Sequence, residues 1–245
     1  LLSSLALVSG STVQNVTSVM EALAKSEFSS TSKQVILDQL NKGVITEFDG
    51  SLALPFIRQI EKSGDIGLVS TLASLRQKLK LSSSPEFLAF SKVALKILSD
   101  KSKDNSIRFK QFSLIEFLPY EQKADVLFSC LSNTEPMNIQ EAALRQLGNY
   151  PKPEIGVRLV NQWPELGPQT RRYASDILVY KKIHHDALLT GLEKGIINIG
   201  EMNFDLERRR QLLYRTDNED TKRRAAALFS DAGVTTRKEA IDKMK

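Results

Sequence analysis

Apolar residues recur at helical spacing in short segments along the whole chain, and this pattern constrains the fold more than any other feature. The segments are roughly 11–16 residues long, and connections of about two to five residues separate them. Short links make successive helices antiparallel neighbours, so the structural unit is a helical hairpin. One hairpin cannot bury its apolar face alone, whereas a stack of hairpins forms a continuous core. The sequence therefore predicts an all-α fold, an α-α superhelix (solenoid) of antiparallel helical hairpins.

Apolar spacing and stop signals also place the individual helices. Ser11 or Thr12 is expected to cap a first helix, and a second is expected to follow Ser30–Ser32 and to end at Gly43. Further helices are expected at about 51–62, 65–80, 85–100, 104–118, 120–132, 138–149, 152–163, 167–180, 182–195, 203–215, 218–231 and 235–244.

The hairpin over residues 138–163 carries the clearest local signals. Asn138 is expected to be an N-cap, and Glu141 three residues later would complete a capping box. Pro153 suits the first turn of the second helix, since its missing N–H would be unpaired there anyway. Trp163, the sole tryptophan, stands where that helix stops. We expect it to pack in the corner of the hairpin rather than to anchor a partner.

Composition agrees with a globular helical chain. Hydrophobic residues make up 41% and charged residues 26%, unlike a disordered chain. The 12 glycines fall between apolar segments and not in the pairs typical of β-hairpins. We expect a single domain over 1–245 with a weak subdivision near 100–104. Leu1–Gly10 resembles the tail of a helix and lacks the Met and basic segment of a signal peptide, so we expect an internal piece of a longer protein.

The net charge of +5 is a small basic surplus. Acidic residues lie among the basic ones almost everywhere, for example Asp205 and Glu207 beside Arg208–Arg210. A surplus this small indicates solvated helix faces more than a nucleic-acid groove, so nucleic acid is not expected as a partner. No run approaches the roughly 18 apolar residues that a membrane span requires, so no span is expected.

Few residues are candidates for catalysis, metal binding or phosphate binding. Cys130 lies in an apolar run, which predicts a buried structural thiol. His184 and His185 predict a surface pair at a helix start, because neighbouring helical side chains point about 100° apart and metal ligation requires convergent ligands. Gly64–Gly67 predicts a helix connector and not a phosphate loop, and no G-x-S-x-G motif is present. We therefore expect no catalytic residue, no cofactor and no metal.

Several segments between Asn138 and Asp231 resemble one protein family. The segments are Ala142–Leu147, Val160–Leu166 with a basic helix from Arg171, Leu192–Gly195, Arg208–Leu213 and Asp217–Phe229. Together they are similar to the HEAT-like region of large bacterial, planctomycete-type membrane-bound dehydrogenases. In that family a β-propeller of the sorbosone/glucose dehydrogenase type precedes the helical region, and a cytochrome c domain with a CxxCH haem motif follows it.

The resemblance implies HEAT-like hairpins that serve as a non-catalytic spacer and protein-interaction module between redox domains. It also implies a periplasmic or cell-surface location. The chain has a single Cys, so it holds no CxxCH motif, and none of the family's catalytic or haem residues maps onto it.

Basic clusters in the second half are the candidates for partner docking. They could form a solvated ridge with carboxylate partners, or dock an acidic flanking domain of the same polypeptide or another protein. The alternative function is a stand-alone HEAT-like adaptor, or a DNA-glycosylase-like repeat protein with an aromatic side chain that stacks on an extruded base. The oligomeric state stays open. The candidate docking residues are Trp163, Arg171, Arg172, Arg208, Arg209, Arg210, Arg223 and Arg224.

Overall fold

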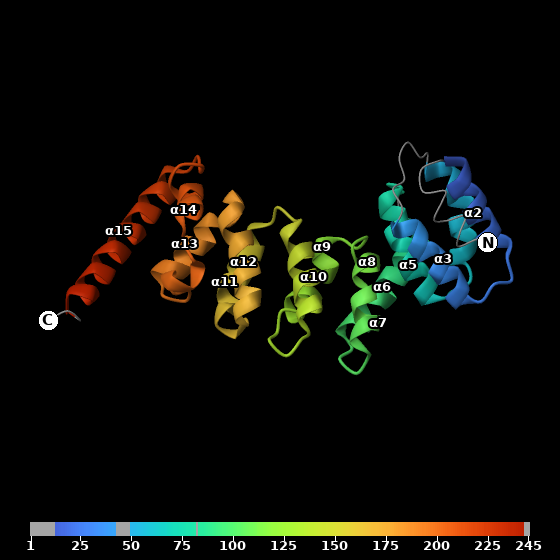
Figure 1. The fold of residues 1–245 in the computed structure, drawn as a ribbon, viewed down its shortest axis with the longest axis horizontal. Coiled ribbons are helices and arrows are strands. Elements are labelled where there is room, and N and C mark those ends of the chain that lie inside the picture. The colour runs from blue at the N-terminus through green and yellow to red at the C-terminus, as the bar shows by residue number, and fades with distance from the viewer. Residues whose placement is uncertain (1–12, 43–49, 82, 243–245) are drawn as a thin grey trace. The chain divides into compact units, whose positions relative to one another are not determined.

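The computed structural model describes residues 13–42, 50–81 and 83–242. Every element of regular structure in these residues is a helix, and helices pack on their neighbours along the chain (Figure 1). The all-α fold of stacked helical hairpins expected from the sequence is confirmed. Across the same residues, no helix is both long enough and apolar enough to cross a membrane.

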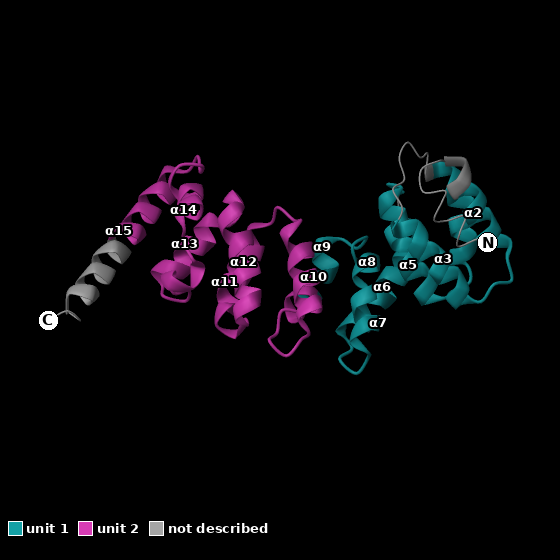
Figure 2. Ribbon diagram, viewed as in Figure 1, with its two compact units in different colours: residues 1–126 teal, residues 127–245 magenta. Residues whose placement is uncertain are grey.

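The chain divides into two compact units, residues 1–126 and 127–245 (Figure 2). The single domain over 1–245 stays a prediction, and the boundary lies beyond 100–104, where we expected a weak subdivision. The helix tail predicted for Leu1–Gly10, the cap at Ser11 or Thr12 and the stop at Gly43 all lie outside the described residues.

Unit 1 begins with two stacked hairpins. Helix α2 packs on α4 and α3 packs on α5, so equivalent helices of successive hairpins are neighbours. Helix α8 then packs on both α5 and α6. The elements are α2 (Val13–Lys25), α3 (Ser30–Lys42), η1 (Gly50–Ala53), α4 (Leu54–Glu61), α5 (Ile66–Lys78), α6 (Pro85–Ser99), α7 (Asn105–Lys110), α8 (Phe112–Ile115) and α9 (Tyr120–Ser129), which crosses into unit 2.

The core of the first two hairpins takes one apolar stripe from each helix. Met20, Leu37, Ile57 and Leu72, from α2, α3, α4 and α5 respectively, are fully buried in one cluster. Side-chain caps fix the starts of α5, α6 and α7. Asp65, for example, accepts hydrogen bonds from the backbone N–H groups two and three residues later, at 2.9 and 3.1 Å.

Unit 2 is a stack of three hairpins. Helix α12 packs on α10 and on α14, while α13 packs on α11 and on α15. The first helices of the hairpins therefore form one row and the second helices another. The elements are α10 (Met137–Gly148), α11 (Pro153–Gln162), η2 (Trp163–Glu165), α12 (Pro168–Tyr180), η3 (Lys182–His184), α13 (His185–Glu193), η4 (Ile199–Met202), α14 (Leu206–Leu213) and α15 (Glu219–Asp242).

The start of α10 differs from the sequence-based expectation. The helix begins at Met137, and Asn138 is not its cap. The carbonyl of Pro136 accepts the first backbone bonds, from the N–H groups of Ile139 and Gln140 at 3.0 and 3.1 Å. The fixed φ of proline, here −58°, sets the chain for helix entry, so the predicted capping box does not form.

Two predicted helix boundaries are also wrong. Residues 218–231 and 235–244 were expected as two helices, whereas α15 is continuous to Asp242, because an isolated glycine weakens a helix without breaking it. The helix expected at 104–118 instead divides at Gln111 into α7 and α8. There the Gln111 amide donates to the carbonyl of Ile107 and the Ser113 hydroxyl to that of Lys110, so side chains compete for backbone acceptors.

Candidate interaction site

Trp163 lies in the corner between α11 and η2 and is only 1% exposed. Its Nε1–H donates to the Glu201 carboxylate at 2.7 Å. Arg171 of α12 pairs with the same carboxylate at 3.2 Å and donates from Nε to the Trp163 carbonyl at 3.0 Å. The predicted packed corner is therefore confirmed, and the indole is not exposed to a partner.

Arg208 connects α14 to α12 of the preceding hairpin. Its guanidinium donates to the Ser175 hydroxyl at 2.9 Å and to the Met202 carbonyl at 2.7 Å, and it pairs with Asp176. The Arg208 side chain is only 11% exposed. Asp205 fixes the backbone at Arg208. The Asp205 carboxylate caps α14 by accepting a hydrogen bond from the Arg208 backbone N–H at 2.8 Å.

Arg224 makes the equivalent connection from α15 to α13. It holds Glu193 by two hydrogen bonds of 2.7 Å each, and it donates to Asp186 at 2.6 Å and to Thr190 at 3.0 Å. The hydrogen bonds and charge of Arg224 lower the pKa of the Glu193 carboxyl, and the same pairing raises the pKa of Arg224. Two parallel N–H···O bonds fix the orientation of the guanidinium against the Glu193 carboxylate in addition to pairing the charges. The ammonium group of a lysine could not form this planar arrangement.

These three arginines form what we call the arginine ties: Arg171, Arg208 and Arg224. Arg171 joins the Trp163 corner, in the first hairpin of unit 2, to η4. Arg208 joins α14 to α12, and Arg224 joins α15 to α13. Each tie therefore joins elements of successive hairpins. They were predicted only as docking candidates, and the structure shows that much of their hydrogen-bonding capacity is used inside unit 2.

The other four docking candidates remain on the surface of unit 2. Arg209 donates to the Phe204 carbonyl at 3.0 Å and lies over the Phe229 ring, Arg210 lies 3.9 Å from Glu207, and Arg223 pairs with Asp220. Arg172 is exposed, and its side chain has no hydrogen-bond or ion-pair partner among the described residues. A docking role for these residues stays a prediction.

His184 and His185 are buried, at 0% and 2% exposure, so the predicted surface pair is wrong. The reason is Gly156 on α11, where the absence of a side chain admits the His184 ring; a Cβ there would lie 3.0 Å from it. His185 Nε2 lies 2.8 Å from the Val179 carbonyl, while neither ring nitrogen of His184 has a partner in the described part. No group of three or more metal-ligating side chains occurs among the described residues.

Acidification below about pH 6.5 is expected to destabilise the protein through these histidines. Burial lowers the pKa of His184 from 6.5 to about 4 and also lowers that of His185. Between these values the unfolded state binds more protons than the folded state, so stability present above pH 6.5 is lost as pH falls. His184 alone accounts for a loss of about 2 kcal/mol between about pH 7 and pH 5, measurable by urea unfolding.

The matched control is His184→Leu, which cannot titrate. Its free energy of unfolding should change much less between the two pH values. An equal loss in the wild type and in His184→Leu would show that other groups cause the pH dependence.

Unit 1 holds buried charged side chains that were not predicted from the sequence. Arg76 and Glu61 are 0% and 4% exposed and form two hydrogen bonds, from Nε to Oε1 at 2.6 Å and from Nη2 to Oε2 at 3.0 Å. Lys123 is also fully buried, and its Nζ donates to the Ile115 carbonyl at 2.8 Å at the end of α8. Burial lowers the pKa of Lys123 to about 8.

Cys130, in unit 2, is buried as predicted.

The fold and the arginine ties define this chain as an all-α helical-repeat protein. Comparison with known proteins adds no closer assignment: no protein-family model, no curated protein and no solved structure matches the chain.

Proposed function

We propose that the chain is a non-catalytic helical-repeat scaffold, a spacer and protein-interaction module. The arginine ties are the observation that supports this function most strongly. The stability of a repeat stack comes from each repeat and from the interfaces between neighbours. Charged hydrogen bonds across those interfaces resist sliding of one hairpin over the next. A stack stiffened in this way suits the task of holding partner domains at a fixed separation.

The proposed partners are redox domains, and this part rests on the resemblance of residues 138–231 to the HEAT-like region of planctomycete-type dehydrogenases. On that basis the chain links or docks a propeller-type oxidoreductase domain and a cytochrome c domain, in the same polypeptide or in another protein. The same resemblance supports a periplasmic or cell-surface location.

The DNA-glycosylase-like alternative receives less support from the geometry. Such a protein needs an aromatic face that is free to stack on an extruded base. Trp163 is the only tryptophan, and it is buried and bound to Glu201. Arg208 and Arg224 hold carboxylates of their own chain, which leaves less positive charge for phosphates.

Capture of purified domains on the immobilised chain tests the proposal. The probes are a propeller-type domain and a cytochrome c domain from a dehydrogenase of the resembled family. We expect saturable binding of at least one of them at low salt. The variant Arg172→Glu/Arg210→Glu should weaken it by about tenfold, since surface charge reversal acts on encounter and orientation. Binding of neither domain would contradict the proposed function.

The matched control is Lys92→Glu/Lys96→Glu on α6, which makes the same change in net charge on exposed side chains of unit 1. Equal weakening by both variants would indicate a bulk charge effect and not docking at Arg172 and Arg210.

A further inference from the structure

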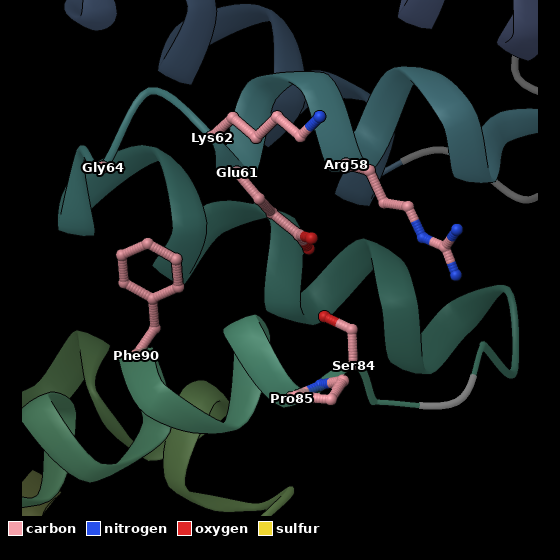
Figure 3. Close-up of a pocket in the computed structure, with 7 residues that line it drawn as sticks. All are labelled: Arg58, Glu61, Lys62, Gly64, Ser84, Pro85 and Phe90. Carbon is pink, nitrogen blue, oxygen red and sulfur yellow. The ribbon is translucent and has the colours of Figure 1, made fainter.

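A cavity of about 590 Å³ lies in unit 1, between the last turn of α4 and the start of α6 (Figure 3). Pockets that bind small ligands fall in the range of about 300–1,000 Å³, so this cavity is large enough to hold a side chain of a partner. The cavity is formed entirely within this unit, and none of the docking residues predicted from the sequence contributes to it.

Two cationic side chains stand at the rim of the cavity. Arg58 lies on α4, and Lys62, four residues later, caps the C-terminal end of that helix; both are exposed. Neither side chain has a hydrogen-bond or ion-pair partner among the described residues. They differ in this from the arginine ties, whose charges are matched by carboxylates of the chain.

Glu61, which also lines the cavity, does not cancel this positive charge. Its carboxylate is held by two hydrogen bonds from the buried Arg76, so the pair is neutral as a unit. With Arg58 and Lys62 added, the described side chains that line the cavity carry a net positive charge, which favours an anionic occupant.

The cavity has an apolar side and a polar side. Figure 3 shows the Phe90 ring opposite Arg58, with the Glu61 carboxylate and the Ser84 hydroxyl between them. Phe90 and Pro85 supply the apolar surface. An aliphatic or aromatic side chain of a partner could lie against this surface while its carboxylates reach the rim.

The groups between these two sides favour a peptide over a free inorganic anion. A bare phosphate would lie close to the Glu61 carboxylate. A peptide backbone instead offers N–H donors to Glu61 and carbonyl acceptors to the Ser84 hydroxyl, which already accepts from the Phe87 N–H at 3.1 Å. One acceptor, one hydroxyl donor and two cations together suit an extended peptide that carries acidic side chains.

We propose that the cavity between α4 and α6 docks an acidic segment of a partner protein. An apolar side chain of the segment inserts against Pro85 and Phe90, and its flanking carboxylates pair with Arg58 and Lys62. This inference rests on the proposed function as an interaction module and assigns one of its binding surfaces.

Fluorescence anisotropy of the full chain with a short labelled peptide tests the inference. The probe carries aspartates and glutamates on both sides of one phenylalanine. We expect saturable binding that becomes about tenfold weaker in Arg58→Glu/Lys62→Glu. Phe90→Ala should weaken it as well, and so should a peptide with glycine in place of phenylalanine. A peptide with amides in place of the carboxylates should bind about tenfold more weakly than the acidic probe.

The control for this test is again Lys92→Glu/Lys96→Glu, an exposed pair with the same spacing on α6 and outside the cavity lining. Circular dichroism should show wild-type helix content in both charge variants. The inference is overturned if the acidic peptide does not bind, if both charge variants weaken it equally, or if inorganic phosphate displaces it at equal concentration. If the acidic peptide does not bind while the wild-type chain still captures the redox domains, the docking cavity is refuted and the proposed function stands.

Discussion

Replacing Glu61 by alanine is expected to lower the free energy of unfolding by about 3–5 kcal/mol, because it leaves a buried guanidinium without its carboxylate. Arg76 is fully buried and lies 4.7 Å from the centre of the Phe87 ring. Urea unfolding followed by circular dichroism measures the effect.

The double variant Glu61→Leu/Arg76→Met is the control for this prediction. Replacing both charges by apolar groups of similar size should recover most of the loss, since a buried ion pair is often matched by good apolar packing. The explanation is wrong if Glu61→Ala costs less than about 1 kcal/mol, which is the range of an exposed pair.

Replacing Trp163 by alanine is expected to cost about 3–5 kcal/mol, the range for a large aromatic side chain removed from a core. The indole fills the corner between α11 and η2, and its loss also removes the hydrogen bond to Glu201. Urea unfolding again measures the change.

Trp163→Phe separates packing from hydrogen bonding in this corner. It keeps most of the buried apolar volume but loses the Nε1–H donor. Glu201 is 40% exposed and can turn to water, so this variant should lose less than half of what alanine loses. Equal losses in the two variants would contradict a packing role for the indole.

The helical pattern and most helix positions follow from local spacing, and for that reason they could be predicted from the sequence. The stripes that contain Leu37, Ile57 and Leu72 are buried as their period requires. Helix ends were less predictable. The backbone carbonyl of Pro136 sets the start of α10, and the side-chain amide of Gln111 contributes to the break between α7 and α8. Such single hydrogen bonds cannot be predicted from the spacing of apolar residues.

The roles of charged and titratable residues depend on contacts between helices far apart in sequence. The burial of His184 depends on Gly156 in the preceding hairpin, and Arg224 finds Glu193 across 31 residues. One such signal was available in the sequence. Glu61 follows Ile57 by four residues and Arg76 follows Leu72 by four, so both charges occupy core positions of apolar stripes.

We propose that the chain binds protein partners and does not read nucleic acid, and one binding measurement separates these two functions. Fluorescence anisotropy compares a labelled propeller-type domain and a labelled cytochrome c domain of the resembled family with labelled duplex DNA across a salt series. We predict saturable binding of at least one domain at low salt and no comparable binding of DNA. DNA affinity that rises steeply at low salt, with a slope that implies several phosphate contacts, and no binding of either domain would contradict the proposed function.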